Sequence, residues 1–457
     1  MKITSVHFRH ITHFADLKLE LNYHDLPITL ILADQSAGKT SLLRFSYQAL
    51  TWFAARYKDL RTAGLVMQDQ DILFNRLQAK IDICVEIPAE IGSLAESSNM
   101  QLESTHHCDW QLYKTLNSSG VGVSKAETAK LEKMVQLYQH AIKHDPMQGL
   151  PLIAYYPAER FVNEVNLLNK NNPLILQPGH AYEIAAIPFT TFTRFFEWLR
   201  EISDIENAKS AQLLHKLYQQ QQSELPQALN QSLLHAYSQM HAPSLQALKD
   251  ALQIVLPEIE DIYLQYLPKL QLMVRCQGKE LLYQQLSNSQ RNWIALVGDI
   301  VRRLCLLNPN SLYPCREGDG ILLIDQIDHQ LDQQQAAQIL TRLHQAFPRL
   351  QIIATGNRSE LLEQAERFQC LKLEHQQLHH IAWQSLQPQF AEIYADVLET
   401  THTVEEVSLQ EQNLTQLGTA EIWQQIQHHL TAEQKQELLQ RLQQLDREPA
   451  PDQLPES

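Results

Sequence analysis

The stretch ITLILADQSAGKTSLL, residues 28–43, constrains the fold of this chain more than any other. An apolar run, Ile28–Leu32, is followed by a short loop of small and polar residues, and a helical pattern begins near Lys39. A short apolar run bounded by such a loop predicts a buried strand, and apolar residues at helical spacing predict a helix. The segment therefore predicts a strand, a tight loop and a helix in immediate succession.

The loop matches most of the P-loop pattern G-x-x-x-x-G-K-[ST], in which backbone N–H groups and a lysine hold phosphates and a hydroxyl holds Mg²⁺. Only the first glycine is replaced, by Ala33. A methyl group there costs about 1 kcal/mol if the position needs a positive φ, and almost nothing otherwise. The nucleotide-binding residues that this motif predicts are Ala33, Asp34, Gln35, Ser36, Ala37, Gly38, Lys39, Thr40 and Ser41.

A second motif follows far downstream in GILLIDQID, residues 320–328. An apolar strand that ends in an aspartate is how a Walker B strand delivers a carboxylate to a magnesium shell. We therefore expect Thr40 and Asp325 to hold Mg²⁺ beside ATP. Ahead of this strand, LSNSQR precedes an apolar helix, and its first five residues are Leu286, Ser287, Asn288, Ser289 and Gln290.

This order of P-loop, LSNSQ segment, Walker B strand and a further strand, with a long helical insertion after the P-loop, resembles the ABC-type ATPases. Their signature motif is usually written LSGGQ. The resemblance implies that two subunits sandwich ATP, with the P-loop of one facing the signature of the other. Nucleotide binding would then drive the chain to form a dimer or higher oligomer.

Hydrolysis is a separate ability, and three positions that would serve it depart from the ABC-type pattern. Gln326 stands where a carboxylate would position or deprotonate water, Asn357 stands at the switch histidine, and Ser289 replaces a signature glycine. An amide can hydrogen-bond a water molecule but cannot take its proton. We therefore expect the chain to bind ATP and to hydrolyse it slowly or not at all.

A competing interpretation is that another carboxylate acts as the base. Glu317, Asp319 and Asp328 are close to the Walker B strand in the sequence. If one of them could reach the water, hydrolysis would be retained.

The pattern of elements predicts an α/β fold: an ABC-type P-loop head with a mainly parallel central sheet, antiparallel N-terminal strands, a helical arm insertion and a helical C-terminal segment. We expect strands in residues 2–20, 72–87, 150–156, 262–276, 321–325 and 350–355, and helices in residues 41–57 and 333–346 and from Ser289. The expected units are the N-terminal part of the head (1–89), a surface insertion (90–149), a return strand and connection (150–190), the helical arm (191–257), the C-terminal part of the head (258–384), C-terminal helices (385–446) and a disordered tail (447–457).

The composition limits the class of protein further. Hydrophobic residues make up 44% and charged residues 19% of the 457 residues, and no stretch approaches the roughly 18 continuous apolar residues that span a membrane. Six cysteines without any CxxC pair predict reduced thiols, and a cytoplasmic protein without membrane contact is expected. The formal net charge of −15 argues against a generally basic, nucleic-acid-coating surface. The basic pair in VRRL, residues 301–304, is expected on a solvated helix face or end.

Three segments resemble the AAA/ABC-type ATPases called PtuA, which occur in Septu antiphage systems and in retrons with Septu-like genes. They are LPLIAYYPAERFV (150–162), TFTRFFEWLREISDIEN (191–207) and the helix that follows LSNSQ. The resemblance covers about residues 1–380 and implies an antiviral defence role. It also implies assembly with a separately encoded HNH endonuclease and, in a retron, with a reverse transcriptase and its RNA-linked DNA. Nucleic acid would be contacted through that complex.

Two other classes of function stay open at this point. A RecF- or SMC-like repair ATPase would bind double-stranded DNA and turn over ATP, and a nucleotide-free scaffold would have no affinity for ATP. Residues 385–457 are too short and too helical in pattern for an appended Toprim nuclease. The segment 424–445 has leucines at helical spacing, which predicts a helix that packs on the head or docks a partner.

Overall fold

A six-stranded sheet in the order β16-β15-β3-β14-β13-β9 forms the centre of the computed structural model. The structure describes residues 1–381 except 24, 35, 99–100, 118–119, 163–177, 183–191 and 222–242. All neighbouring strands pair in parallel except β15 and β16. Every residue of β9, β13 and β14 is buried, as expected for a sheet covered on both faces. The strands are β3 (Ile28–Leu32), β9 (Leu152–Tyr156), β13 (Gly320–Ile324), β14 (Leu350–Gly356), β15 (Gln369–Glu374) and β16 (Gln377–His380).

A second, antiparallel sheet has the order β2-β1-β4-β7-β8. It is built from β1 (Lys2–Ile11), β2 (Phe14–Glu20), β4 (Gln78–Glu86), β7 (His107–Leu116) and β8 (Gly122–Glu127). The hairpin β5 (Leu94–Ser98) and β6 (Gln101–Thr105) pairs separately, and helix α2 (Ala129–His144) packs on β7. Residues 90–149, expected to be a surface insertion, therefore supply two strands of the N-terminal sheet.

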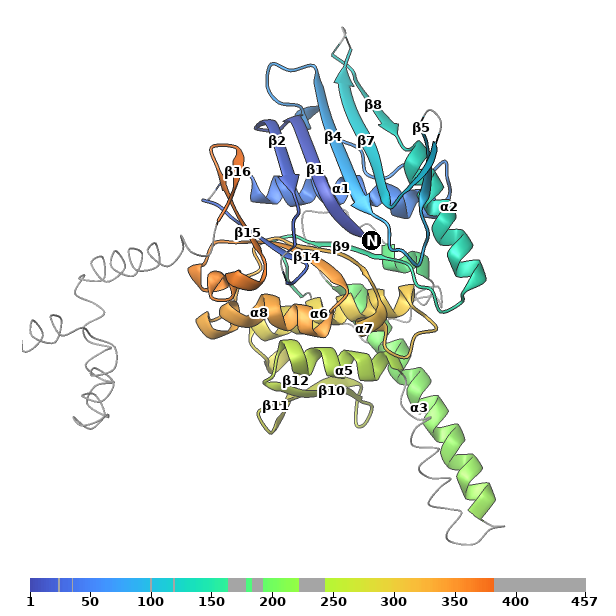
Figure 1. The fold of residues 1–457 in the computed structure, drawn as a ribbon. Helices are drawn as coiled ribbons and strands as arrows, with labels where there is room; N and C mark the ends of the chain where they lie inside the picture. The colour runs from blue at the N-terminus through green and yellow to red at the C-terminus, as the bar shows by residue number, and fades with distance from the viewer. Residues whose placement is uncertain are drawn as a thin grey trace, which may run out of the picture. The chain divides into compact units, whose positions relative to one another are not determined.

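Helix α1 (Lys39–Lys58) lies between the two sheets and contacts β4 on one side and β9 on the other (Figure 1). Burial on both sides explains why its residues from Phe45 to Phe53 are all buried. The helix begins at the lysine of the P-loop motif, so the packing of α1 fixes the position of that loop.

Two buried glutamines connect the sheets. The Gln351 side chain accepts a hydrogen bond of 2.6 Å from the Ile3 N–H and donates one of 2.9 Å to the Ile3 carbonyl. Gln369 accepts from the Thr29 hydroxyl at 2.9 Å and donates to the Glu20 carbonyl at 3.0 Å. Because buried polar groups are costly when unpaired, these bonds hold the N-terminal sheet at one relative position.

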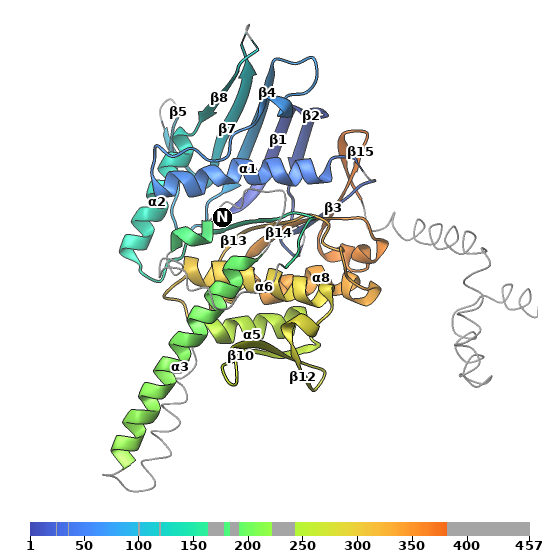
Figure 2. The same ribbon diagram turned by 180° about the vertical axis from the view of Figure 1, so that it is seen from behind.

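The other face of the central sheet is covered by α6 (Asn288–Leu307) and α8 (Gln333–Ala346), with α5 (Pro243–Val255) packed against both helices (Figure 1). The small sheet β10 (Ile259–Gln265), β11 (Gln271–Cys276) and β12 (Lys279–Leu282) lies beyond α5. Helix α3 (Thr193–Gln221) starts against α6 and extends away from it (Figure 2). The short helices are α7 (Pro314–Glu317), η1 (Asp69–Asp71), η3 (Pro178–Tyr182), η4 (Tyr283–Gln285), η5 (Ser359–Leu362) and η6 (Ala365–Arg367).

The α/β class, the mainly parallel central sheet and the antiparallel N-terminal strands are confirmed. Helix α8 has the predicted bounds, and all six cysteines are free. Strands β5, β6, β7, β8, β12, β15 and β16 were not predicted. The chain divides into two units, Met1–Gln384 and Ser385–Ser457, and the predictions for residues 385–457 lie outside the described residues. None of the helices in the described ranges is long and apolar enough to cross a membrane.

The prediction that the VRRL pair is solvated is wrong. Arg302 is 1% exposed, and Arg302 and Arg303 both form ion pairs with the buried Asp299 at 2.8 Å. Tyr156 of β9 donates a further hydrogen bond of 2.9 Å to the same carboxylate. Opposite charges on one helix, three and four residues apart, can neutralise each other in the interior, which a count of basic residues does not reveal.

Candidate functional site

The carboxyl ends of four adjacent parallel strands bring the predicted motifs to one edge of the central sheet. The P-loop follows β3, the switch position follows β14, Asp325 follows β13, and the segment Pro157–Arg160 follows β9. The strand registers pair Leu32 with Gly356 and Ile324 with Tyr156. Ligands of open α/β sheets bind at this edge, outside the carboxyl ends of the strands.

The P-loop turns tightly into α1. Among its described residues, Ser36 and Gly38 have positive φ values of 64° and 102°, whereas Ala33 does not. A Cβ atom on Gly38 would lie 2.1 Å from His13 Nε2, so only glycine fits there. The replacement of the first motif glycine by Ala33 therefore causes no backbone strain at that position. Gln35 lies outside the described residues.

Lys39 is buried at the start of α1, with 7% of its surface exposed. Its ammonium donates hydrogen bonds to the carbonyls of Ala33 and Asp34, the latter at 2.9 Å. Burial lowers the pKa of Lys39, and the nearby carboxylates of Asp325, Asp34 and Asp328 oppose that shift. The lysine therefore points into the turn of its own loop, where a P-loop lysine meets phosphate.

Asp325 is the centre of a hydrogen-bond network that joins three strands. It is 0% exposed, and its Oδ2 accepts a bond of 2.6 Å from the Thr40 hydroxyl. Its Oδ1 accepts a bond of 2.5 Å from the Thr355 hydroxyl of β14, and its N–H donates to the Tyr156 carbonyl at 2.9 Å. The two predicted magnesium ligands, Thr40 and Asp325, are therefore in direct contact.

The residue after the aspartate, Gln326, has a left-handed backbone with φ 47°. Its N–H donates to the Thr355 hydroxyl at 2.9 Å, and its carbonyl accepts from Arg160 at 2.9 Å. A non-glycine residue in this region costs about 1 kcal/mol or more and persists only where neighbours hold it. The amide at the position of the catalytic carboxylate thus sits on a fixed backbone.

The switch position is tied to the Walker B loop through Asp328. One oxygen of this buried carboxylate, Oδ2, accepts from the N–H groups of Asn357 at 2.9 Å and Arg358 at 2.8 Å. The side chain of Asn357 is exposed at the same edge of the sheet. Asp328 therefore orients the loop that carries Asn357, and its hydrogen bonds favour this structural role over that of a base.

The other two carboxylates considered as bases lie at the wrong end of β13. Glu317 accepts from the Ser311 hydroxyl and Asp319 from the amino terminus of Met1, and both line a separate cavity of about 330 Å³. The five residues of β13, Gly320–Ile324, separate them from Asp325. At about 3.3 Å per residue, the six steps from Asp319 to Asp325 span about 20 Å. The geometry contradicts a role for Glu317 or Asp319 as the base.

The signature segment starts helix α6. Ser287 is its N-cap, and Ser287 and Gln290 form a capping box, in which the Ser287 side chain accepts from the Gln290 N–H. The Ser289 hydroxyl donates to the carbonyl of Gln330, which lies in the Walker B loop. Leu286 is buried and Asn288 exposed. Within one chain, the signature therefore contacts the loop after Asp325.

Four residues of this edge were not predicted as site residues. Thr355 and Arg160 each form hydrogen bonds with Asp325 and Gln326. Asn292 forms hydrogen bonds with Arg160 and Gln330. The His13 side chain lies 3.2 Å from the Ala37 carbonyl of the P-loop. Each acts across a large sequence separation. No local pattern in the sequence would have found these residues, because their roles depend on which strands and loops become neighbours in the fold.

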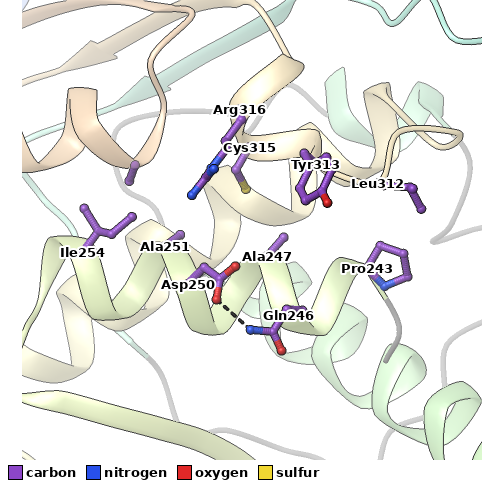
Figure 3. Close-up of a pocket in the computed structure, with 11 residues that line it drawn as sticks. Pro243, Gln246, Ala247, Asp250, Ala251, Ile254, Leu312, Tyr313, Cys315 and Arg316 are labelled. Carbon is purple, nitrogen blue, oxygen red and sulfur yellow. Dashed lines mark hydrogen bonds between the residues drawn. The ribbon is translucent and has the colours of Figure 1, made fainter. Parts of the chain in front are cut away.

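Another cavity of about 210 Å³ lies between α5 and α7, with Asp250 and Gln246 hydrogen-bonded at 2.7 Å on α5 (Figure 3). Leu312 and Tyr313 at its rim are exposed. Its lining includes no residue of the P-loop, the signature segment or the Walker B loop. The cavity is therefore separate from the candidate nucleotide site.

Together, the topology and the site define an ABC-type P-loop head. The parallel sheet carries the P-loop, Walker B and switch segments on adjacent strands, and an antiparallel sheet covers α1. The oxygen atoms of Thr40 and Asp325 are the donor type that Mg²⁺ prefers, and a site with few protein ligands leaves room for phosphate oxygens and water. The residues present therefore fit a magnesium ion.

Relatives with similar sequences are named as retron ATPases. The chain is 28% identical over 395 residues to the "Retron Ec83 probable ATPase" of Escherichia coli, and the matched region covers 78% of this chain and 68% of that protein. It is 23% identical over 361 residues to the "Retron Vc95 probable ATPase" of Vibrio cholerae serotype O1 biovar El Tor, and the matched region covers 74% of this chain and 66% of that protein. The chain thus spans about two thirds of the length of each relative. No protein-family model matches it.

Solved structures of SMC head domains have a similar arrangement of elements at low sequence identity. The SMC head bound to the C-winged helix domain of ScpA matches with a TM-score of 0.45 and 10% identity, over 85% of this chain and 100% of that one. The SMC head domain from Thermotoga maritima matches with a TM-score of 0.38 and 11% identity, over 83% of this chain and 98% of that one.

Proposed function

We propose that this chain is an ATP-binding protein that needs Mg²⁺ and hydrolyses ATP slowly or not at all. The observation that carries the proposal is the hydrogen bond between Thr40 and Asp325 beside Lys39. The residue that directly follows Asp325, where a catalytic carboxylate would stand, is Gln326. Lysine, hydroxyl and carboxylate are the groups that bind a nucleotide and its metal, and they are all present. The carboxylate that would accept a proton from water is an amide.

The chain's own residues divide the task of binding. Lys39 offers a buried ammonium to the phosphates, and the N–H groups of the turn from Ser36 to Gly38 are suited to anion binding at the start of α1. Thr40 and Asp325 would hold Mg²⁺, which neutralises charge on the phosphates when bound. Gln326 can hydrogen-bond a water molecule through its amide but leaves it neutral.

We further propose that the chain acts in bacterial antiviral defence of Septu or retron type. The names of the two relatives support a retron ATPase, and the resemblance to PtuA supports a separately encoded HNH endonuclease as its partner. In a retron, a reverse transcriptase and its RNA-linked DNA would join the assembly. Nucleotide binding between two copies would regulate the nuclease through the shape of the dimer.

A steady-state assay tests the catalytic half of this proposal. With saturating Mg²⁺ and ATP, we expect turnover well below about 1 per second, the low end of ordinary enzymes. The Lys39→Met variant serves as the background control because it retains the aliphatic stem and loses the charge. Turnover at or above that rate that is absent from the control would contradict slow hydrolysis.

Co-purification tests the partner half. The chain is expressed with the HNH and reverse-transcriptase genes that neighbour its own gene, and the complex is isolated through a tag on the chain. We expect an HNH protein to co-purify, and the amount of HNH protein per molecule of the chain to depend on ATP. Strong turnover together with binding to double-stranded DNA, and no HNH partner, would support a RecF- or SMC-like repair ATPase instead.

A further inference from the structure

Arg160 is a buried cation at the edge of the central sheet where the candidate nucleotide site lies, and its side chain donates hydrogen bonds to backbone carbonyls. It is 6% exposed, and its guanidinium donates to the carbonyls of Pro157 at 2.9 Å, Asp325 at 2.5 Å and Gln326 at 2.9 Å. In the described part of the chain it forms no ion pair within 4.0 Å. A buried charge held mainly by carbonyl dipoles is costly, so its position has to be fixed by several bonds at once.

The guanidinium stays charged in spite of burial. An arginine side chain keeps its proton at neutral pH in proteins. At neutral pH the side chain can therefore donate to both Asp325 and Gln326 with a planar, preorganised fork. A lysine has neither this fork geometry nor the same number of donors.

The backbone of Arg160 connects to the signature helix. Its carbonyl accepts a hydrogen bond of 3.2 Å from the Asn292 amide, which also donates to the Gln330 side chain at 2.7 Å. One turn earlier on α6, the Ser289 hydroxyl donates to the Gln330 carbonyl. Arg160 thus bonds through its side chain to the Walker B loop and through its backbone to the start of α6.

We infer that Arg160 is a positioning residue that couples the nucleotide site to the signature segment of the same chain. A change at Asp325 on nucleotide binding would move the carbonyls that the guanidinium holds. The movement would pass through the Arg160 backbone to Asn292 and the first turn of α6. The inference deepens the proposed function and rests on it, because the signature turn is where the second subunit's nucleotide would dock.

Hydrogen–deuterium exchange tests the connection without any nucleotide. In the ligand-free protein, Arg160→Lys should raise exchange both in residues 325–331 and in residues 287–293, because both segments lose a common anchor. Arg303→Lys is the matched control, since Arg303 is an arginine of α6 with only 12% of its side chain exposed, and it lies about 16 Å along the helix from Asn292. Faster exchange in residues 325–331 alone, or equal effects of both variants, would overturn the inference.

Nucleotide titrations separate coupling from simple damage to the site. For Arg160→Lys we expect the ATP concentration for half-maximal dimerisation to rise by about tenfold or more beyond any loss of ATP affinity measured in the same protein. Asn292→Ala should act in the same way, and the double variant should be no worse than the stronger single one, because both break one connection. Equal losses in binding and dimerisation, or additive effects, would contradict coupling.

These outcomes also distinguish the inference from the proposed function. A wild-type protein that binds no ATP would contradict the proposed function, while the exchange experiment on the ligand-free protein would still decide whether Arg160 links the two segments.

Discussion

The Thr40 hydroxyl donates a hydrogen bond of 2.6 Å to Asp325 Oδ2 across 285 residues of sequence. This contact joins the first turn of α1 to the end of β13, and a second hydroxyl, from Thr355, fixes the other carboxylate oxygen. Asp325 therefore has one orientation before any nucleotide binds. Preorganised ligands reduce the free-energy cost of binding a metal and its nucleotide.

The first prediction concerns the metal. Removing Mg²⁺ with EDTA should weaken ATP binding to the wild type by about tenfold or more, because the phosphate charge is no longer neutralised. Asp325→Asn keeps the shape but loses the charge, so its weaker ATP binding should no longer respond to EDTA. Calorimetric titration measures both, and Asp109→Asn on the exposed face of β7 is the control. An Asp325→Asn protein with normal magnesium dependence would contradict the assigned ligand.

The second prediction concerns the missing base. Gln326→Glu should raise steady-state turnover by about 100-fold, the typical contribution of a general base, because the residue's backbone is already fixed by Thr355 and Arg160. Gln326→Ala should leave turnover at the wild-type level. A phosphate-release assay compares the three proteins. If the glutamate variant is as slow as the alanine variant, the amide at this position is not the reason for slow hydrolysis.

The third prediction concerns the turn of the P-loop. Gly38→Ala should destabilise the loop and abolish nucleotide binding, because φ is 102° and the new methyl group would overlap His13 and Phe14. Left-handed strain alone costs about 1–2 kcal/mol. Gly179→Ala is the matched control, since nothing lies within 4 Å of its added Cβ. Thermal unfolding and ATP titration should distinguish the two variants, and equal behaviour would refute the described turn.

Much of this site could be predicted because its signals are local. The strand, loop and helix around Lys39 are contiguous, and Asp325 ends an apolar run, so periodicity and a short motif located both. Thr355, Arg160 and Asn292 could not be predicted, because their roles depend on which strands become neighbours. No local pattern encodes the strand order that places β9 and β14 on either side of β13.

The N-terminal sheet shows the same limit in the fold. Strand β7 alternates buried and exposed residues over Cys108, Trp110 and Leu112, but it lies within residues 90–149, whose polar and mixed composition led to the expectation of a surface insertion. Strand β8 is the edge of the sheet, and none of its residues is buried, so it has almost no hydrophobic pattern. The burial of Gln351 and Gln369 could not be predicted from the sequence either, because glutamine side chains are rarely buried.

The fourth prediction concerns acid stability. Burial, with Arg367 and Lys2 nearby, lowers the pKa of His344 below its ordinary value of 6.5. The unfolded chain therefore binds the proton more tightly, so this stability contribution is present above about pH 6.5 and is lost as the pH falls below it. His344→Gln removes the titrating group. The free energy of unfolding of the variant should fall less between pH 7 and pH 5 than that of the wild type, as measured by urea denaturation at each pH. An identical fall in both proteins would contradict the lowered pKa of His344.

The most direct test of the central claim is an equilibrium titration of the wild type and Lys39→Met with a fluorescent ATP analogue in the presence of Mg²⁺. We expect saturable binding to the wild type and a loss of about 100-fold or more in the variant, because the buried ammonium at the start of α1 can no longer meet the phosphates. Absence of binding to the wild type, or equal affinity in both proteins, would contradict a nucleotide site at Lys39, Thr40 and Asp325.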